Sequence, residues 1–183
     1  MRPRVRATVE DLYRVPDNGK AELIDGELIR MSPTGGIPGR AGGRIYRSLD
    51  DYESSGGDGY AFPDNVGFIV DLPSRGSFSP NAAFHPGPLQ GGKYMDNAPI
   101  FAAEVRSEGD YGPRAEREMA EKRADCFAAG TLVVWDVDVL RERVVRVYRA
   151  EDPETPVVYR SGDAAEAEPA LPGWTMPVDD LLP

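Results

Sequence analysis

The sequence is poor in the residues that build disulfides and zinc sites. Among its 183 residues it has one cysteine, Cys126, and one histidine, His85. A single cysteine excludes an internal disulfide, and together these counts exclude a His-rich or Cys/His zinc site. Any metal bound by this chain must therefore be held by oxygen ligands, which favours Mg²⁺, Mn²⁺ or Ca²⁺.

Long hydrophobic runs are also missing. No stretch approaches the roughly 18 apolar residues of a membrane span, and no apolar segment of signal-peptide length follows the basic residues near the N-terminus. With 40% hydrophobic residues, the chain is still too apolar to be disordered throughout. We therefore expect a soluble, cytoplasmic protein with no membrane partner.

A net positive charge, which is the usual footprint of a nucleic-acid-binding protein, is absent as well. The chain has 31 acidic and 21 basic residues, for a formal net charge of −10. This excess is uneven, because residues 151–183 carry eight acidic residues and one basic residue, whereas residues 1–50 carry nine basic and seven acidic residues. The acidity therefore does not exclude DNA as a partner, although it gives that partner no support.

Glycine and proline are abundant, with 20 and 17 copies, which excludes long helical bundles and favours short strands and loops. In order, the patterns predict a short helix with Thr8 as its N-cap (8–14), a hairpin around Asp25-Gly26 (21–32), a Gly-rich loop (34–43), a helix (44–54), three strands (59–70, 77–84, 98–105), a helix (114–130), a buried strand (131–138), a half-exposed strand (144–149) and an irregular tail (171–183). This order predicts one mixed α/β domain over residues 1–183, with a central sheet flanked by helices and an N-terminal β-hairpin. We expect the acidic segment 151–183 to pack on this domain through Trp174.

Glu104 is the first candidate functional residue, because it stands near the end of the apolar run IFAAEV. Burying a carboxylate costs several kcal/mol unless it is paired or bound to a metal. Strand alternation puts Ile100, Ala102 and Glu104 on one face of the predicted strand. The alternative is a glutamate at the sheet rim that pairs with Arg106 or another base.

Lys122 is the second candidate. Ala115, Met119, Cys126 and Ala129 recur at helical spacing, and Lys122 lies on this apolar stripe rather than among the other charges of the helix. The chain has 18 arginines and three lysines, and lysine is a compact charge that can orient or lose a proton. The alternative is a packed stem with the ammonium in water. Cys126, on the same stripe, is interpreted as a core residue.

Asn81 is the third candidate, because asparagine is disfavoured in strands and here interrupts the strand-like SFSPNAAF. The alternative is a residue that caps its own backbone.

The loop at 34–43 lacks the Gly-Lys-Ser/Thr ending of a phosphate-binding loop, but as a mobile flap it could bring Arg40 and Arg44 to a phosphate. Glu22 is a possible second acid or part of a merely acidic hairpin, and we expect His85 to lie in a loop.

Six segments together resemble one protein family: MSPTGG (31–36), SPNAAF (79–84), AEVRS (103–107), Lys122 with AAG (128–130), VVWDVD (133–138) and LPGW (171–174). They resemble the Uma-two family of bacterial restriction-endonuclease-like proteins, within the PD-(D/E)xK nuclease superfamily. The match runs in order over nearly the whole chain. The resemblance implies a restriction-endonuclease-like core in which an Asp and a Glu hold a divalent metal and a basic group orients the attacking water.

Carried over to this chain, the resemblance makes Glu104 the glutamate of the second motif and a metal ligand. Arg106 stands where the superfamily has lysine, so Lys122 on the following helix is expected to take the basic role, and Glu22 matches a glutamate of the N-terminal hairpin. Asn81 replaces the metal-binding aspartate. An amide oxygen can still ligate Mg²⁺, but the site loses one negative charge.

The resemblance implies an Mg²⁺- or Mn²⁺-dependent endonuclease that hydrolyses DNA phosphodiester bonds, weakened by Asn81. The alternative is a catalytically inactive nuclease-fold protein with a binding or regulatory role, and a third possibility is hydrolysis of another phosphate ester. Another acid could replace the missing aspartate, and Asp64, Asp96 and Asp110 are the candidates. We also expect a homodimer.

Overall fold

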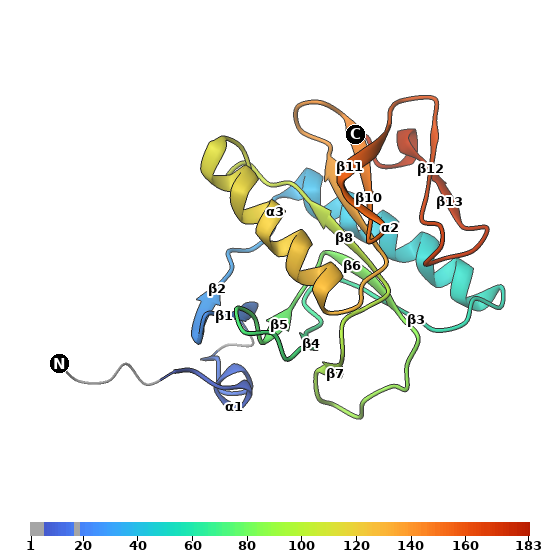
Figure 1. The fold of residues 1–183 in the computed structure, drawn as a ribbon. Coiled ribbons are helices and arrows are strands. Elements are labelled where there is room, and N and C mark those ends of the chain that lie inside the picture. Colours follow the sequence, from blue (N-terminus) through green and yellow to red (C-terminus); the bar gives the residue numbers. More distant parts are fainter. Residues whose placement is uncertain (1–5, 17–18) are drawn as a thin grey trace.

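The computed structural model describes residues 6–16 and 19–183, and its centre is a six-stranded sheet with the strand order β11-β10-β9-β8-β6-β3 (Figure 1). The strands are β3 (Tyr60–Phe62), β6 (Ala82–His85), β8 (Phe101–Val105), β9 (Val133–Asp138), β10 (Val144–Arg149) and β11 (Asp152–Tyr159). β8 and β9 run parallel, and every other neighbouring pair in this sheet is antiparallel. The predicted mixed α/β fold with a mixed central sheet is therefore confirmed.

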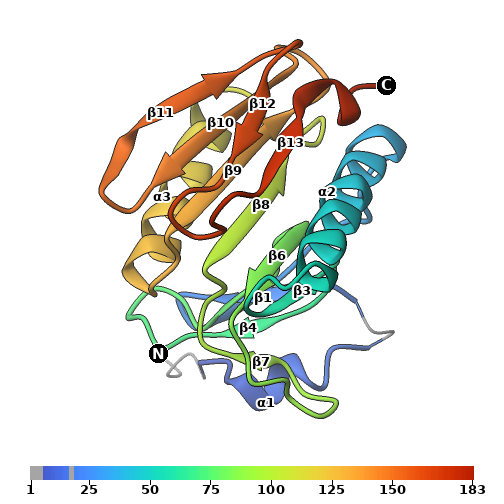
Figure 2. The same ribbon diagram turned by 90° about the vertical axis from the view of Figure 1, so that its right-hand side faces the viewer.

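Two long helices cover the two faces of this sheet, as Figure 2 shows. On one face, α2 (Gly36–Ser54) buries Ile45 and Leu49 in a core that includes Phe101 and Trp135. On the other face lies α3 (Pro113–Ala128), which begins at Pro113 and packs Cys126 into a second, smaller core. Strand alternation in β8 thus sends Phe101 toward α2 and leaves Glu104 on the face covered by α3.

The N-terminal part follows its prediction closely. The short helix α1 (Val9–Leu12) has the capping box of Thr8 and Asp11. The hairpin consists of β1 (Ala21–Ile24) and β2 (Glu27–Arg30), and both turn residues, Asp25 (φ 51°) and Gly26 (φ 75°), have the positive φ that a tight two-residue turn requires. A small three-stranded sheet of β4 (Phe68–Ile69), β5 (Ser77–Phe78) and β7 (Met95–Asp96) lies beside it.

The predicted Gly-rich loop at 34–43 is wrong, because most of that segment is the first half of α2. Gly42 is buried where the helix passes Asn81, and a Cβ at Gly42 would lie 3.4 Å from the Cβ of Asn81. The glycine thus serves close packing rather than mobility. The flap role proposed for Arg40 and Arg44 is wrong for the same reason, and the Arg44 guanidinium donates hydrogen bonds to the backbone carbonyls of Asp180 and Leu182.

The C-terminal segment is more regular than expected. It forms a two-stranded sheet of β12 (Ala164–Glu166) and β13 (Thr175–Pro177), followed by the 3₁₀ turn η2 (Val178–Asp180). Trp174 is buried, its ring centre lies 4.9 Å from that of Trp135, and its Nε1–H donates to Ser48 Oγ over 3.0 Å. The acidic segment therefore packs on the core through Trp174, but the expectation of an irregular tail is wrong.

Further boundaries differ from the sequence prediction. The predicted strand 77–84 is two strands, β5 and β6, which belong to different sheets. The predicted strand 59–70 is two strands, β3 and β4, separated by a turn in which Asn65 has φ 67°. His85 is the buried last residue of β6 rather than part of a loop. β10 is mostly buried instead of half exposed, because the unpredicted β11 pairs with it and makes it an inner strand. No helix in the described ranges is long and apolar enough to span a membrane.

Candidate functional site

A buried ammonium between two carboxylates lies at the centre of the candidate site. The Nζ atom of Lys122 is 2.8 Å from Oε1 of Glu104 and 2.9 Å from Oε1 of Glu22. α3 supplies the lysine, β8 supplies Glu104 and β1 supplies Glu22. The Lys122 side chain is only 15% exposed, so the alternative of an ammonium in water is wrong. Three residues that the sequence analysis singled out are thus brought together.

Glu104 is the carboxylate with the least support from its surroundings. Burial raises its pKa and the nearby Glu22 charge adds to that effect, although Lys122 and Lys20 oppose it. Its Oε1 lies 2.8 Å from Nζ of Lys122, whereas its Oε2 has no hydrogen bond or ion pair in the described part of the chain. An oxygen of this kind retains the capacity to bind a cation or a donor group.

Glu22 has the opposite character, because its oxygens are well supplied with donors. Its Oε1 accepts the Ser79 backbone N–H over 2.9 Å, and its Oε2 accepts Nη1 of Arg75 over 2.8 Å. Burial alone would raise the pKa of Glu22, but Lys122 and Arg75 outweigh burial and hold that pKa below its ordinary value. The same two carboxylates act on Lys122, so its pKa lies above the ordinary lysine value in spite of burial. Lys122 is therefore a permanent cation at neutral pH.

Arg75 and Asp125 complete the cluster and were missed by the sequence analysis. Arg75 is buried in the chain segment before β5, and its Nε donates to Oδ2 of Asp125 over 2.8 Å. Asp125 lies one helical turn after Lys122, so both project from the same face of α3. That spacing was a signal available in the sequence. No sequence pattern marks Arg75, because it stands in a polar turn, SRGS, far from its partners along the chain.

Asn81 lies directly before β6, beside the end of β8. Its backbone N–H donates to the Ala103 carbonyl over 3.0 Å, and its Oδ1 accepts the Val105 N–H over 2.8 Å. The two bonded residues, Ala103 and Val105, flank Glu104 in β8, so the backbones of Asn81 and Glu104 are neighbours across the two chain segments. The side-chain oxygen of Asn81 has one lone pair engaged by the backbone and one remaining.

Arg106 lies in a separate ionic network, although it follows Glu104 by two residues. Its Nε and Nη2 donate to the two carboxylate oxygens of Asp136 over 2.7 and 2.6 Å, and it also binds Glu116 on α3. Asp136 and Glu116 raise the pKa of Arg106 further above its already high value. Among the described residues, no interaction joins Arg106 to Glu104 or Lys122. The structure therefore does not bring it to the cluster.

None of the acids considered as substitutes for the missing aspartate contacts Glu104 in the described part of the structure. Asp64 accepts Nζ of Lys20 over 2.6 Å, Asp110 accepts the Ser107 N–H over 2.6 Å, and Asp96 is an exposed residue of β7. Asp136 is the Cα partner of Glu104 in the parallel pair β8–β9, but Arg106 occupies both of its oxygens.

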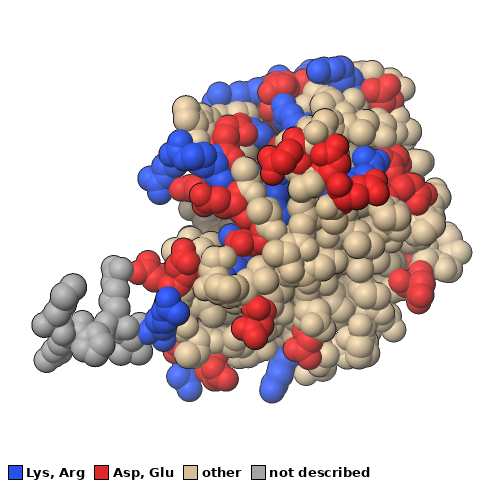
Figure 3. Space-filling view, in the orientation of Figure 1, with Lys and Arg blue, Asp and Glu red and all other residues tan. Residues whose placement is uncertain are grey.

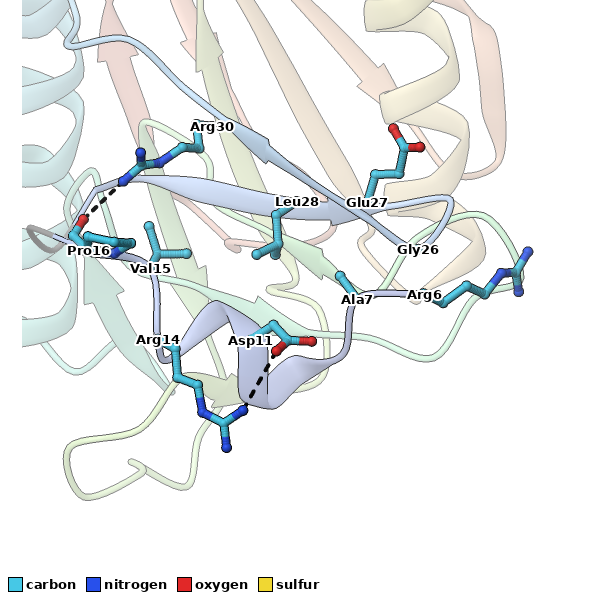
Figure 4. A pocket seen from close by; sticks show the side chains of 10 residues that line it. All are labelled: Arg6, Ala7, Asp11, Arg14, Val15, Pro16, Gly26, Glu27, Leu28 and Arg30. Carbon is cyan, nitrogen blue, oxygen red and sulfur yellow. Dashed lines mark hydrogen bonds and ion pairs between the residues drawn. The ribbon is translucent and has the colours of Figure 1, made fainter. Parts of the chain in front are cut away.

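A surface hollow of about 640 Å³ lies elsewhere, between the α1 segment and the turn side of the hairpin (Figure 4). At its rim, Nη1 of Arg14 lies 3.8 Å from Oδ1 of Asp11, and Nη2 of Arg30 donates a hydrogen bond to the Pro16 carbonyl over 3.1 Å. None of the cluster residues lines it. The hollow and the charged cluster are thus separate features.

The donor set of the cluster is compatible with a divalent metal, but only through few ligands. Within residues 6–16 and 19–183, no group of three or more His, Cys, Asp or Glu side chains is arranged to hold a metal. Oε2 of Glu104, which has no partner in the described part of the chain, and the remaining lone pair of the Asn81 amide are oxygen donors of the type that Mg²⁺ accepts. Because Mg²⁺ commonly binds through one or two carboxylates together with waters and substrate phosphates, the chemistry of these two donors suits such an ion.

The mixed sheet, the two covering helices and the charged cluster beside β8 together define a restriction-endonuclease-like α/β protein. The chain belongs to the Uma2 family, described as "Putative restriction endonuclease", whose model matches residues 8–179. Among solved structures, the fold is similar to that of "a putative nuclease belonging to DUF820" from Anabaena variabilis ATCC 29413, with a TM-score of 0.74, 17% sequence identity, and coverage of 95% of this chain and 96% of that chain. The comparison with curated proteins found no match.

Proposed function

We propose that this protein is a metal-assisted phosphodiesterase that acts on DNA, with Glu104, Asn81 and Lys122 as its active-site residues. The observation that carries the proposal is the half-buried carboxylate of Glu104, whose Oε1 lies 2.8 Å from a permanently charged lysine and whose Oε2 has no partner among the described residues. Neither residue is needed for packing, and each would be costly to bury without a function or a partner. Membership of the Uma2 family supports the same activity.

In this proposal, Glu104 and Asn81 would hold Mg²⁺ or Mn²⁺, which when bound would polarise a phosphoryl oxygen and activate water. Lys122 contributes a fixed positive charge beside the reacting phosphate, where it stabilises the negative charge that develops. Because its pKa is raised, Lys122 acts as a cation and not as a proton acceptor. Glu22 helps to fix the position of that ammonium, because its Oε1 lies 2.9 Å from Nζ.

DNA as the substrate rests on the family and on the local distribution of charge. On the face shown in Figure 3, Lys and Arg gather near the start of α3 but are interspersed with Asp and Glu. Most of the excess of acidic residues, eight acidic against one basic, lies after residue 150, away from the cluster in sequence. We therefore expect weak, salt-sensitive DNA binding rather than tight binding to a broad basic surface. A homodimer and a cytoplasmic location remain predictions, the first to be checked by light scattering.

The test is a cleavage assay on plasmid and short single- and double-stranded DNA with Mg²⁺ or Mn²⁺. The variants are Asn81→Asp, Glu104→Gln and the control Glu108→Gln, which removes an exposed carboxylate from the loop after β8. Cleavage that Glu104→Gln abolishes and Glu108→Gln leaves intact supports the proposal, as does cleavage gained only in Asn81→Asp. Wild-type cleavage that survives Glu104→Gln overturns the assignment of the site.

One observation favours a second candidate, a non-catalytic nuclease-fold protein with a binding or regulatory role. The Asn81 side chain already satisfies the Val105 N–H, so this residue has a structural use without any metal. If neither the wild type nor Asn81→Asp cleaves DNA, but DNA binding is measurable, the result would favour this candidate.

A further inference from the structure

Arg75 makes the site unusual, because it brings a second buried cation to one of its two carboxylates. Its side chain is 5% exposed, its Nη1 lies 2.8 Å from Oε2 of Glu22, and its guanidinium carbon lies 5.0 Å from the centre of the Phe78 ring. Nε donates at the same time to Asp125. The guanidinium is thus fixed by two carboxylates and an aromatic face.

The lone pairs of Glu22 are largely used up by this arrangement. Oε1 faces both the Ser79 N–H and the Lys122 ammonium, and Oε2 faces Arg75. A metal ligand must offer a free lone pair and an uncompensated negative charge, and Glu22 offers little of either. Any cation at Glu22 would also meet the positive charges of Arg75 and Lys122 at short range.

Glu104 differs on each of these points. Its Oε1 is paired with Lys122, its Oε2 has no hydrogen bond or ion pair among the described residues, and its side chain is 27% exposed and so reachable from solvent. The two glutamates, although they share one ammonium, are therefore not equivalent toward a metal.

We propose that Arg75 is a positioning residue that withdraws Glu22 from metal coordination and commits it to holding Lys122, which confines the metal to Glu104 and Asn81. This inference deepens the proposed function and rests on it for the presence of a metal at Glu104. It predicts that removal of Arg75 converts Glu22 into an additional metal ligand and so strengthens metal binding.

The experiment measures Mn²⁺ affinity by electron paramagnetic resonance of the free ion, on the full chain without DNA. Arg75→Gln removes the guanidinium charge, and Arg75→Gln with Asp125→Asn removes both members of the pair, leaving neutral groups that can bond to each other. Asp125→Asn alone is the matched reference for the double variant, and Arg114→Gln, which removes an exposed arginine of α3 paired with Glu118, controls for loss of one positive charge.

We expect Arg75→Gln to bind Mn²⁺ about tenfold more tightly than Arg114→Gln, and the double variant about tenfold more tightly than Asp125→Asn. The reason is that each gains Glu22 as a further carboxylate ligand, freed from the positive charge of Arg75. Adding Glu22→Gln to the double variant should abolish that gain, because Glu22 is the ligand released. If Arg75→Gln fails to fold, the double variant carries the comparison. A double variant that binds Mn²⁺ no more tightly than Asp125→Asn, or whose gain survives Glu22→Gln, overturns the inference.

The measurements of metal affinity and of DNA cleavage can refute the role of Arg75 and the proposed activity separately. If affinity rises as expected while no variant cleaves DNA, the role of Arg75 holds and the proposed activity falls. If the wild type or Asn81→Asp cleaves DNA but Arg75→Gln and the double variant leave Mn²⁺ affinity unchanged, the activity holds and the role of Arg75 falls.

Discussion

The ammonium of Lys122 lies 2.8 Å from the carboxylate of Glu104, and this pair joins the central sheet to the helix that covers it. Glu22 holds the same ammonium from the N-terminal hairpin at 2.9 Å. One lysine therefore balances one buried and one half-buried carboxylate from elements far apart in sequence. Removal of any member leaves the others with an altered charge balance, so stability measurements can test the arrangement before any activity is known.

Replacing Lys122 with methionine should be strongly destabilising. The apolar stem would still pack, but Glu22 and Glu104 would lose the cation between them, and removal of one partner from a buried ion pair typically costs about 3–5 kcal/mol. Urea unfolding measures the difference. Lys93→Met, at an exposed lysine, should change the free energy of unfolding by less than about 0.5 kcal/mol. A small effect of Lys122→Met would show that the ammonium does not hold the cluster together.

Replacing Glu104 with glutamine should leave the protein as stable as the wild type or stabilise it by about 1 kcal/mol. The reason is that burial raises the pKa of Glu104, so its charge is less favourable in the folded protein than in the unfolded chain. Lys122 retains Glu22 as its partner. Thermal unfolding at neutral pH without metal checks this expectation, and a large loss of stability in Glu104→Gln would contradict it.

Replacing Asn81 with aspartate should make stability depend on metal. An aspartate oxygen can still accept the Val105 N–H, but a second negative charge beside Glu104 should cost about 1–2 kcal/mol in the absence of a cation. Mn²⁺ should recover this loss by binding only to the folded state. Thermal unfolding with and without Mn²⁺ measures both effects.

The control is Asn81→Ala, which removes the acceptor of the Val105 N–H. It should be destabilised by a similar amount, about 1–2 kcal/mol, but without recovery in Mn²⁺. Equal responses of the two variants to the metal would argue against a cation site at this position.

His85 should make the protein less stable in mild acid. Its Nε2 lies 3.0 Å from the Asp96 carbonyl, its Nδ1 accepts the Gly87 N–H over 2.9 Å, and it stacks on Phe68. The ring is therefore neutral, and burial lowers its pKa below the ordinary 6.5 although Asp96 opposes this effect. The unfolded chain takes up a proton more readily, so the contribution of His85 is complete above about pH 6.5 and is lost as pH falls below that value.

The measurement is the free energy of unfolding between pH 7.5 and 5.5. In wild type, His85 should add a decline of at most about 1.4 kcal/mol per pH unit. His85→Asn can accept the Gly87 N–H but cannot titrate, so it should lack this part of the decline. Parallel pH curves for the two proteins would count against the role of His85.

The sequence was most informative where one periodicity determined the position of a side chain. Strand alternation placed Glu104 on the face opposite Phe101, and the helical stripe around Lys122 pointed it inward, as the structure has them. Arg75 could not be found in this way, because its partners, Glu22 and Asp125, lie about 50 residues away on either side. Such contacts depend on how the turn before β5 folds back onto the hairpin, which no local pattern records.

The segment 34–43 shows how composition can mislead. Its glycines suggest a loop, but Gly42 and Gly43 lie within α2 and have different surroundings. Glycine in a helix is allowed at a cost in conformational entropy, and the helix here is stabilised by burial of Ala41, Ile45 and Leu49. The presence of glycine at position 42 is therefore explained by the tertiary contact with Asn81 and not by local helix preference.

This difference gives a final prediction, which compares two neighbouring glycines. A Cβ added to Gly43 meets nothing within 4 Å, so Gly43→Ala should stabilise the protein by about 0.5–1 kcal/mol through helix propensity. A Cβ at Gly42 would lie 3.4 Å from that of Asn81, so Gly42→Ala should gain little, and Gly42→Leu should displace Asn81 and destabilise by at least about 2 kcal/mol. Urea unfolding of the three variants distinguishes these effects. A Gly42→Leu protein as stable as Gly43→Ala would show that α2 does not press on Asn81, and would remove the packing reason for glycine beside the candidate site.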